Sequence, residues 1–295
     1  MSGEATNAMS EDSGDLSGKV VLVTGATSGI GEATARALAA RGATVAIVGR
    51  TEERAQAARE RIQATTGALN LPVVSADLAS QQDVRALANQ VKDRFGGLDV
   101  LINNAGVDVG QRSVTPDGLE LTFAVNYLAP FLLTTQLVDL LKASAPSRVI
   151  NVVSGAHRGG RIDFDDLQSE RRFGQRAYNN SKLELVMFTY ELARRLQGSG
   201  VTANCVDPGF VRTGLGSTMS PGYRLVGALM WPFMSDPDRG AKTSIWAASS
   251  PELAEVTGAY LKGEHKIETA KKTHDRETAQ RLWRASEDLI SGSAP

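Results

Sequence analysis

The stretch KVVLVTGATSGIGEATARALAA, residues 19–40, carries the clearest structural signal in this chain. Lys19–Val23 is a short apolar run rich in β-branched residues, which suits a buried strand of a parallel sheet. Thr24–Gly31 is rich in glycine, and Glu32–Ala40 has the pattern of a helix. A strand, a glycine-rich turn and a helix in this order place the pyrophosphate of a dinucleotide at the helix N-terminus.

The glycines of this turn follow the spacing G-x-x-x-G-x-G. We expect Gly25 to allow the tight turn, Gly29 to let the phosphates approach the backbone, and Gly31 to let the helix pack against the strand. The alternative is a glycine-rich loop that binds nothing. The strand and the helix that flank the turn favour a dinucleotide site.

The residues after the second predicted strand bear on the choice of cofactor. Ala43–Val48 is that strand, and Gly49-Arg50 follows it. An NAD site places a carboxylate here for the ribose 2′-hydroxyl, whereas an NADP site tolerates or supplies an arginine for the 2′-phosphate. Because Gly49 carries no charge and Arg50 offers a guanidinium, the sequence predicts NADP(H) rather than NAD(H). The alternative is an ordinary exposed arginine paired with Glu52 or Glu53.

Strand-like and helical segments alternate through the rest of the chain. Further strands are predicted at Leu71–Ser75, Asp99–Ile102, Arg148–Val153 and Val201–Val206. The alternation predicts an α/β fold, a Rossmann-type doubly wound parallel sheet in a three-layer α/β/α arrangement. No linker or repeat marks a boundary. We therefore expect a polar, disordered tail over residues 1–17 and a single domain over residues 18–295.

Tyr178 and Lys182 lie four residues apart in a segment with a helical pattern, so they share one helix face. A free phenol has a pKa of about 10 and is a poor acid or base near neutrality. We expect the Lys182 ammonium to lower the pKa of Tyr178, so that the hydroxyl exchanges a proton with an alcohol or a carbonyl. Taken alone, such a pair is more often a solvated helix face.

With these motifs, and with Asn-Asn-Ala-Gly at residues 103–106, the sequence resembles the short-chain dehydrogenase/reductase family over residues 18–263. The resemblance implies a catalytic set of Asn126, Ser154, Tyr178 and Lys182. It also implies a set of cofactor-binding residues: Gly25, Thr27, Ser28, Gly29, Ile30, Gly31, Arg50, Asp77, Leu78, Asn104, Ala105, Gly106, Tyr178, Lys182, Pro208, Gly209 and Thr213.

The same resemblance implies a role for each catalytic residue. Tyr178 donates a proton to the substrate oxygen during reduction, and Ser154 holds that oxygen by a hydrogen bond. Lys182 lowers the pKa of the phenol, bonds the nicotinamide ribose, and with Asn126 organises a water-linked proton path.

Within the family, the sequence is most similar to the retinol-dehydrogenase-like branch, at residues 148–162, 181–201 and 281–289. That branch commonly has two adjacent serines where this chain has Val153-Ser154, so only Ser154 can serve. Its membrane-bound members carry an N-terminal apolar anchor, which we do not expect here. The resemblance supports an apolar substrate without establishing retinol.

The substrate side is predicted after Thr213. Residues 223–234 are rich in aromatic and methionine side chains and are punctuated by glycine and proline. We expect a substrate lid at about residues 214–238, with a helix packed on the core as the alternative. The insert Gly155–Arg176 would form another wall. Charged side chains are sparse between residues 213 and 234, so we expect a small lipophilic aldehyde, ketone or alcohol as the substrate.

Composition excludes several other classes of protein. The 295 residues are 42% hydrophobic and 22% charged with a net charge of -1, so no nucleic-acid partner is indicated. The charged run at residues 50–61 alternates in sign around Ala55, Ala58 and Ile62, which indicates a solvated helix face. The three histidines and Cys205 lack metal-ligand spacing, so we expect no metal. Ser154 and His157 lack the G-x-S-x-G elbow of a hydrolase.

No apolar stretch of about 18 residues is evident, so we expect a cytoplasmic protein without a membrane anchor, and a homodimer remains open. The favoured function is an NADP(H)-dependent oxidoreductase, a carbonyl reductase or alcohol dehydrogenase acting on a lipophilic substrate. Two alternatives stay open: a nucleotide-dependent epimerase or dehydratase, and a non-catalytic NADP-binding redox sensor. The four filled catalytic positions favour the oxidoreductase.

Overall fold

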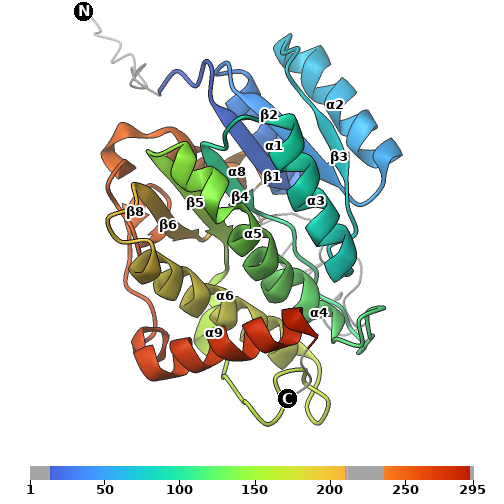
Figure 1. The fold of residues 1–295 in the computed structure, drawn as a ribbon, viewed down its shortest axis with the longest axis vertical. Helices are drawn as coiled ribbons and strands as arrows, with labels where there is room; N and C mark the ends of the chain where they lie inside the picture. Colours follow the sequence, from blue (N-terminus) through green and yellow to red (C-terminus); the bar gives the residue numbers. More distant parts are fainter. Residues whose placement is uncertain (1–13, 210, 212–235, 293–295) are drawn as a thin grey trace, which may run out of the picture.

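A mostly parallel sheet forms the centre of the molecule (Figure 1). The computed structural model describes residues 14–209, 211 and 236–292. Within this part of the chain the sheet has eight strands in the order β3-β2-β1-β4-β5-β6-β7-β8. Neighbouring strands run parallel except β7 and β8, which are antiparallel. The strands are β1 (Val20–Thr24), β2 (Thr44–Gly49), β3 (Val73–Ser75), β4 (Val100–Asn103), β5 (Ser147–Val152), β6 (Val201–Val206), β7 (Tyr260–Lys262) and β8 (His265–Lys266).

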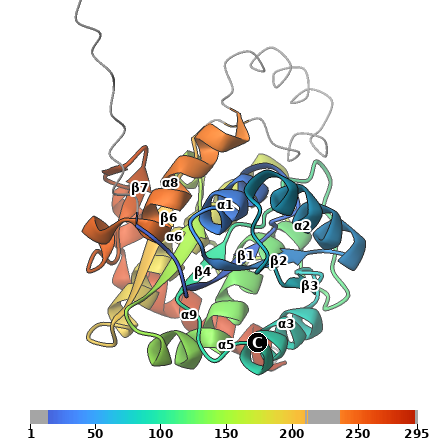
Figure 2. The same ribbon diagram turned by 90° about the horizontal axis from the view of Figure 1, so that it is seen from above.

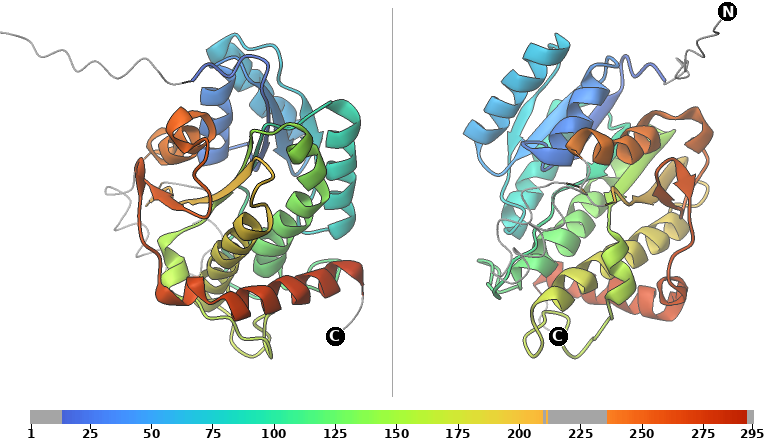
Figure 3. Two further views of the ribbon diagram at one scale, coloured as in Figure 1. Left: turned by 60° about the vertical axis from the view of Figure 1, so that its left-hand side comes forward. Right: turned by 180° about the vertical axis from the view of Figure 1, so that it is seen from behind.

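Helices cover both faces of the sheet, which gives three layers (Figure 2). One face carries α1 (Gly29–Ala39), α2 (Glu52–Thr66) and α8 (Pro237–Ser249). The other carries α3 (Gln81–Arg94), α4 (Leu121–Phe123), a π-helical turn η1 (Ala124–Leu128), α5 (Ala129–Ala143) and α6 (Gln175–Arg195). Helix α9 (Arg276–Ser291) packs against α6 (Figure 3). Short 3₁₀ turns lie at η2 (Gly155–Gly159), η5 (Pro251–Leu253) and η6 (Lys271–His274).

Alternate strand side chains feed two separate cores. Val21 and Val23 of β1 belong to the core beneath α1, α2 and α8, whereas Leu22 belongs to the core beneath α3, α5 and α6. All three are fully buried, and burying each side chain contributes about 1.5–3 kcal/mol. A strand that is covered on both faces reads as a continuous apolar run, which explains the pattern of Lys19–Val23.

Helix α2 contains the charged run that was predicted to form a solvated helix face. The Thr51 hydroxyl accepts a hydrogen bond from the Arg54 N–H at the start of the helix, and Gly67 ends it in the left-handed region at φ 70°. Its buried residues are Ala55, Ala58 and Ile62, as predicted, and its charged residues are exposed except Arg59, which is half-buried.

The predicted fold is confirmed, and each predicted strand overlaps an observed one. Residues 14–17, predicted to lie in the tail, are described: Leu16 is buried, and its N–H donates to the Arg41 carbonyl. Thr213, nearly all of the predicted lid and residues 1–13 lie outside the described residues. One described helical stretch, Leu121–Ala143, is long and apolar enough to cross a bilayer, but 78% of its most apolar window is buried inside the protein. It is a core helix.

The order of the strands also locates the site. The chain winds outward from β1 through β2 to β3, then returns to place β4 on the other side of β1. In doubly wound folds, ligands bind beyond the carboxyl ends of the strands at this switch point. The glycine-rich turn follows the carboxyl end of β1, Asn104-Ala105-Gly106 follows that of β4, and Ser154 lies just beyond that of β5.

Candidate active site

The glycine-rich turn joins β1 directly to α1. The N-cap residue Ser28 has extended backbone at φ −166° and makes no side-chain capping hydrogen bond. The first-turn amides of α1 are therefore not capped by that side chain, as an anion site at a helix N-terminus requires. Gly31 is forced by close packing, because a Cβ there would lie 2.3 Å from the Gly25 carbonyl oxygen. The backbone of this turn fits a dinucleotide pyrophosphate.

Asn104 locks the turn to the end of β4. Its Nδ2 donates to the Thr24 carbonyl at 2.9 Å and to the Gly25 carbonyl at 3.3 Å. In return, the backbone N–H groups of Asn104 and Ala105 donate to Thr24 Oγ1 at 3.0 and 3.1 Å. Asn104 and Ala105, predicted as cofactor residues, thereby fix the shape of the turn.

Arg61, which the sequence analysis did not identify, supports the same turn from α2. Its Nη2 donates to the Thr27 carbonyl at 3.0 Å, and its guanidinium pairs with Glu32 of α1 at 2.8 Å. Arg61 therefore joins the glycine-rich turn to both α1 and α2. No short sequence motif links Arg61 to Thr27, so only the fold shows this contact.

Arg50 lies at the end of β2 with 72% of its side chain exposed. Its Nε pairs with Asp77 Oδ2 at 3.1 Å, so its partner is Asp77 and neither of the glutamates considered as the alternative. Gly49 is tightly packed, since a Cβ there would lie 2.6 Å from Thr27 Cγ2. The cation, the exposed guanidinium and the absence of a carboxylate at position 49 fit a 2′-phosphate.

Tyr178 and Lys182 lie on α6, facing the end of β5. Lys182 Nζ donates to the Val152 carbonyl at 3.1 Å and lies 5.6 Å from the centre of the Tyr178 ring. Lys182 is buried, with 4% of its surface exposed, whereas Tyr178 is partly buried. The helical spacing therefore brings the pair together as predicted.

Ser154 follows β5 and caps η2. Its Oγ accepts from the Ala156 N–H at 3.2 Å, and its side chain lies beside the Tyr178 hydroxyl. The hydroxyls of Ser154 and Tyr178 are therefore neighbours, and a substrate oxygen between them can be held by both.

Asn126 lies in the π-helical turn between α4 and α5. Its Oδ1 accepts from the Val107 N–H at 2.7 Å, and its Nδ2 donates to the Val107 carbonyl at 2.8 Å and to Ser181 Oγ at 3.1 Å. Ser181 Oγ in turn donates to the Tyr178 carbonyl at 2.8 Å. Asn126 thus connects the segment after β4 with the helix that carries the tyrosine, and the four predicted catalytic residues form one cluster.

The electrostatics of the cluster differ from the expectation. Burial, followed by repulsion from Asp108, raises the pKa of Tyr178 to about 12 rather than lowering it. Burial also lowers the pKa of Lys182 to about 8, and Asp108 and Asp207 partly oppose that shift. The expectation considered only the ammonium and omitted desolvation and the two carboxylates. At neutral pH Tyr178 is therefore protonated and can act as an acid.

A buried polar ladder lies beneath the site. Asn103 Nδ2 donates to Thr134 Oγ1 at 3.0 Å and to Asn151 Oδ1 at 2.8 Å, and Asn151 Nδ2 donates to Thr189 Oγ1 at 2.8 Å. These bonds tie β4 to β5 and both strands to the helices that cover them. Asn103 Oδ1 has no hydrogen-bond partner among the described residues, but the three bonds that are made hold these side chains in one arrangement.

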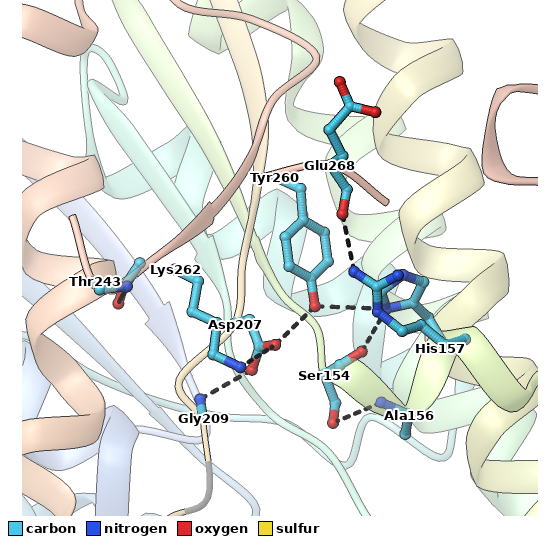
Figure 4. Close-up of polar contacts among 11 residues, drawn as sticks. Ser154, Ala156, His157, Asp207, Gly209, Thr243, Tyr260, Lys262 and Glu268 are labelled. Carbon is cyan, nitrogen blue, oxygen red and sulfur yellow. Dashed lines mark hydrogen bonds and ion pairs between the residues drawn. The ribbon is translucent and has the colours of Figure 1, made fainter. Parts of the chain in front are cut away.

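The Pro208-Gly209 segment follows β6. The Gly209 N–H donates to Asp207 Oδ1 at 2.9 Å, and Ser154 lies nearby, just after the adjacent strand β5 (Figure 4). Thr213, predicted to follow this segment in the site, is outside the described residues. Asp207 is a further buried carboxylate that the motif reading did not include, although it directly precedes the Pro-Gly pair.

Comparisons with known proteins agree with this geometry. A family described as short chain dehydrogenase matches residues 19–223. Human retinol dehydrogenase 13 is 43% identical over 289 residues, covering 95% of this chain and 87% of that protein. Human retinol dehydrogenase 14 is 42% identical over 299 residues, covering 95% and 88% respectively.

Two solved protein structures have folds similar to that of this chain. An uncharacterised protein from Mycobacterium paratuberculosis has a TM-score of 0.77 and 33% identity, covering 95% of this chain and 96% of that one. An active-site complex of Pseudomonas aeruginosa RhlG with NADP has a TM-score of 0.69 and 28% identity, covering 85% and 96%.

Proposed function

Because this chain belongs to the short-chain dehydrogenase family, we propose that it is an NADP(H)-dependent oxidoreductase that interconverts a lipophilic carbonyl compound and its alcohol. The family and the oxidoreductase chemistry are the premise. The cofactor preference and the substrate class are the proposal. The carbonyl–alcohol chemistry is carried by the Ser154 and Tyr178 hydroxyls, which lie side by side near Lys182.

The residues of the chain divide the reduction between them. Bound NADPH would supply a hydride to the carbonyl carbon. Tyr178, protonated at neutral pH, donates its proton to the carbonyl oxygen, while Ser154 keeps that oxygen in place. The phenolate that results is stabilised by the Lys182 ammonium. In the oxidation direction the same groups act in reverse, with the phenolate as the base.

The cofactor preference rests on Arg50. Its exposed guanidinium pairs with the carboxylate of Asp77 and can bind the oxygens of a 2′-phosphate in its place, because each of these groups offers more than one acceptor oxygen. An NAD site would instead place a carboxylate at this end of β2, and the residue before Arg50 is glycine. Dinucleotide binding itself is supported by the α1 N-terminus and the packed turn before it.

The substrate class is supported by the relatives, which are named as retinol dehydrogenases. Retinal and retinol are long, apolar and carry one reacting oxygen. An apolar substrate gains about 0.8 kcal/mol for each methylene that it buries, so the selectivity of such a site increases with chain length. We therefore propose a lipophilic aldehyde of this type as the substrate.

An assay of NADPH consumption tests this proposal. The panel should hold retinal, a series of straight-chain aldehydes and hydrophilic carbonyls such as sugars. We expect kcat/KM to increase with chain length and NADPH to be used in preference to NADH. Efficient reduction of sugars with weak reduction of the apolar aldehydes would refute the substrate class, and equal use of both cofactors would refute the preference for NADPH.

A further inference from the structure

A second polar cluster lies behind Ser154, and its centre is Asp207 (Figure 4). Asp207 is only 3% exposed. Its Oδ1 accepts from the Gly209 N–H, and its Oδ2 accepts from the Tyr260 hydroxyl at 2.9 Å and pairs with Lys262 at 3.4 Å. Tyr260 and Lys262 belong to β7, so the strand next to β6 supplies the partners of this carboxylate.

Tyr260 extends the cluster toward the catalytic serine. Its hydroxyl lies 3.4 Å from His157 Nδ1, and the two rings are 5.0 Å apart between centroids. His157 is fully buried, and its Nδ1 lies 2.8 Å from the Ser154 carbonyl oxygen. A continuous series of contacts therefore runs from Gly209 through Asp207, Tyr260 and His157 to Ser154.

The chemistry of the partners fixes the proton positions. A carbonyl oxygen only accepts hydrogen bonds, so His157 Nδ1 must carry a proton and donate a hydrogen bond to the Ser154 carbonyl. The Tyr260 hydroxyl donates its hydrogen bond to Asp207, so the phenol oxygen can accept one from His157. His157 Nε2 is buried without a partner among the described residues. A bare lone pair there agrees with a neutral ring, and burial lowers the pKa of His157.

This arrangement also excludes one role for His157. Its Nδ1 bonds the carbonyl oxygen of Ser154, whereas the Ser154 hydroxyl accepts from the Ala156 N–H. His157 therefore does not act as a base on the serine. Its contact is with the backbone that holds the serine in place.

We propose, on the basis of the oxidoreductase function above, that Asp207, Tyr260 and His157 are positioning residues that hold the Ser154 backbone in register with the Pro208-Gly209 segment. None of the three contacts the reacting atoms. They act through the Ser154 carbonyl at one end and the Gly209 amide at the other. The aligned Ser154 hydroxyl is needed in the chemical step, whereas the dinucleotide turn after β1 does not depend on these contacts.

The first test removes the hydroxyl at the centre of the series. Tyr260→Phe should lower kcat for the reduction of retinal with NADPH roughly tenfold, the effect of losing one buried hydrogen bond. The NADPH dissociation constant should change less than about twofold, because the α1 turn is untouched and the Gly209 N–H keeps its own acceptor, Asp207 Oδ1. The matched control is Tyr190→Phe, which removes another buried hydroxyl, bonded to Thr269 Oγ1 at 3.0 Å, outside this cluster.

Comparable melting temperatures with a loss of kcat in Tyr260→Phe alone would support the proposal. Equal kcat in the two variants would overturn it. A wild-type enzyme that binds NADPH but reduces neither retinal nor the other apolar aldehydes would instead refute the proposed function, so the two failures are distinguishable.

The second test asks whether turnover depends on the hydrogen bond that His157 Nδ1 donates to the Ser154 carbonyl. The amide of His157→Asn places an N–H close to the position of Nδ1, whereas His157→Leu keeps the bulk and removes the donor. We expect the asparagine variant to retain most of the wild-type kcat and the leucine variant to lose roughly tenfold. Equal losses would show that only packing is at stake and would overturn the proposal.

The third test needs no substrate. The chain has three histidines, so the imidazole nitrogens can be assigned by ¹⁵N NMR with His157→Asn as the reference. The proposal requires His157 to be a neutral Nδ1–H tautomer, with a shift of its Nδ1 signal in Tyr260→Phe. An Nε2–H tautomer would overturn it, because Nδ1 could not then donate to the Ser154 carbonyl.

Discussion

Lys182 Nζ lies 5.6 Å from the centre of the Tyr178 ring while donating a hydrogen bond to the Val152 carbonyl, one residue before the Val153-Ser154 pair. The lysine is thus held by the backbone of β5 as well as by the helix it shares with Tyr178. This contact fixes the distance between the cation and the phenol. It also ties the catalytic helix to the strand that presents Ser154.

Removing the phenol hydroxyl tests the role of Tyr178 as the proton donor. Tyr178→Phe keeps the ring and should reduce kcat by a factor of about 10² or more, the contribution of a general acid. NADPH affinity, measured by fluorescence titration, should change little. A Phe variant with wild-type turnover on retinal would exclude this role.

The two directions of the reaction should respond to pH in opposite ways. The pKa of Tyr178 is raised to about 12, so the phenol is protonated at neutral pH and the phenolate needed for alcohol oxidation is scarce. Oxidation of retinol should therefore accelerate from pH 7 to 10. Reduction should decline near pH 8, where Lys182 loses its proton and no longer stabilises the phenolate.

Initial rates in both directions between pH 6 and pH 10 would check these slopes. Tyr178→Phe serves as the control, since its residual activity should lack the alkaline rise. A flat oxidation profile in the wild type would contradict the acid–base assignment of Tyr178.

A charge reversal at Arg50 tests the cofactor preference. Arg50→Asp removes a charge-assisted bond to the 2′-phosphate and adds repulsion, so NADPH binding should weaken by about 2 kcal/mol, roughly thirtyfold. NADH binding should be nearly unchanged. Arg54→Asp makes the same charge change at an exposed position of α2 and is the matched control. Calorimetric titration would separate the outcomes, and equal losses of both cofactors in Arg50→Asp would reject the assignment.

A buried glutamate gives a prediction for stability. Glu184 is 1% exposed, and burial together with the Glu120 carboxylate raises its pKa well above the ordinary value. A raised pKa in the folded state contributes stability below the unfolded pKa, and that contribution is lost as pH rises. The wild-type free energy of unfolding should therefore fall as the pH rises above the ordinary range of a glutamate pKa, about 4.3.

Glu184→Gln stays neutral at every pH and should flatten this slope. The free energy of unfolding of the variant should therefore depend less on pH than that of the wild type. Urea unfolding at several pH values measures it, with Glu255→Gln at an exposed position as the control. Parallel curves for the wild type and Glu184→Gln would show that Glu184 is not held neutral by the fold.

Much of the fold follows from local sequence patterns. The β-branched runs predicted the strands because both faces of the sheet are covered, and the alternating charges predicted α2 because only Ala55, Ala58 and Ile62 face the core. Spacing also brought Tyr178 and Lys182 together, since residues four apart share a helix face.

The support of the site could not be predicted in the same way. Tyr260 reaches Asp207 across 53 residues of sequence and Arg61 reaches Thr27 across 34, so no local pattern marks either contact. The direction of the Tyr178 pKa shift was also missed. It depends on burial and on Asp108 and Asp207, which only the folded chain brings near the phenol.

Transfer of a labelled hydride tests the central claim most directly. The protein would be incubated with retinal and NADPH carrying deuterium at the transferable C4 position, and the retinol would be analysed by mass spectrometry. The expected result is retinol with one added deuterium on the carbon that bears oxygen, formed at least about 10² times more slowly by Tyr178→Phe. Unlabelled retinol, or no retinol from a protein that demonstrably binds NADPH, would contradict the account.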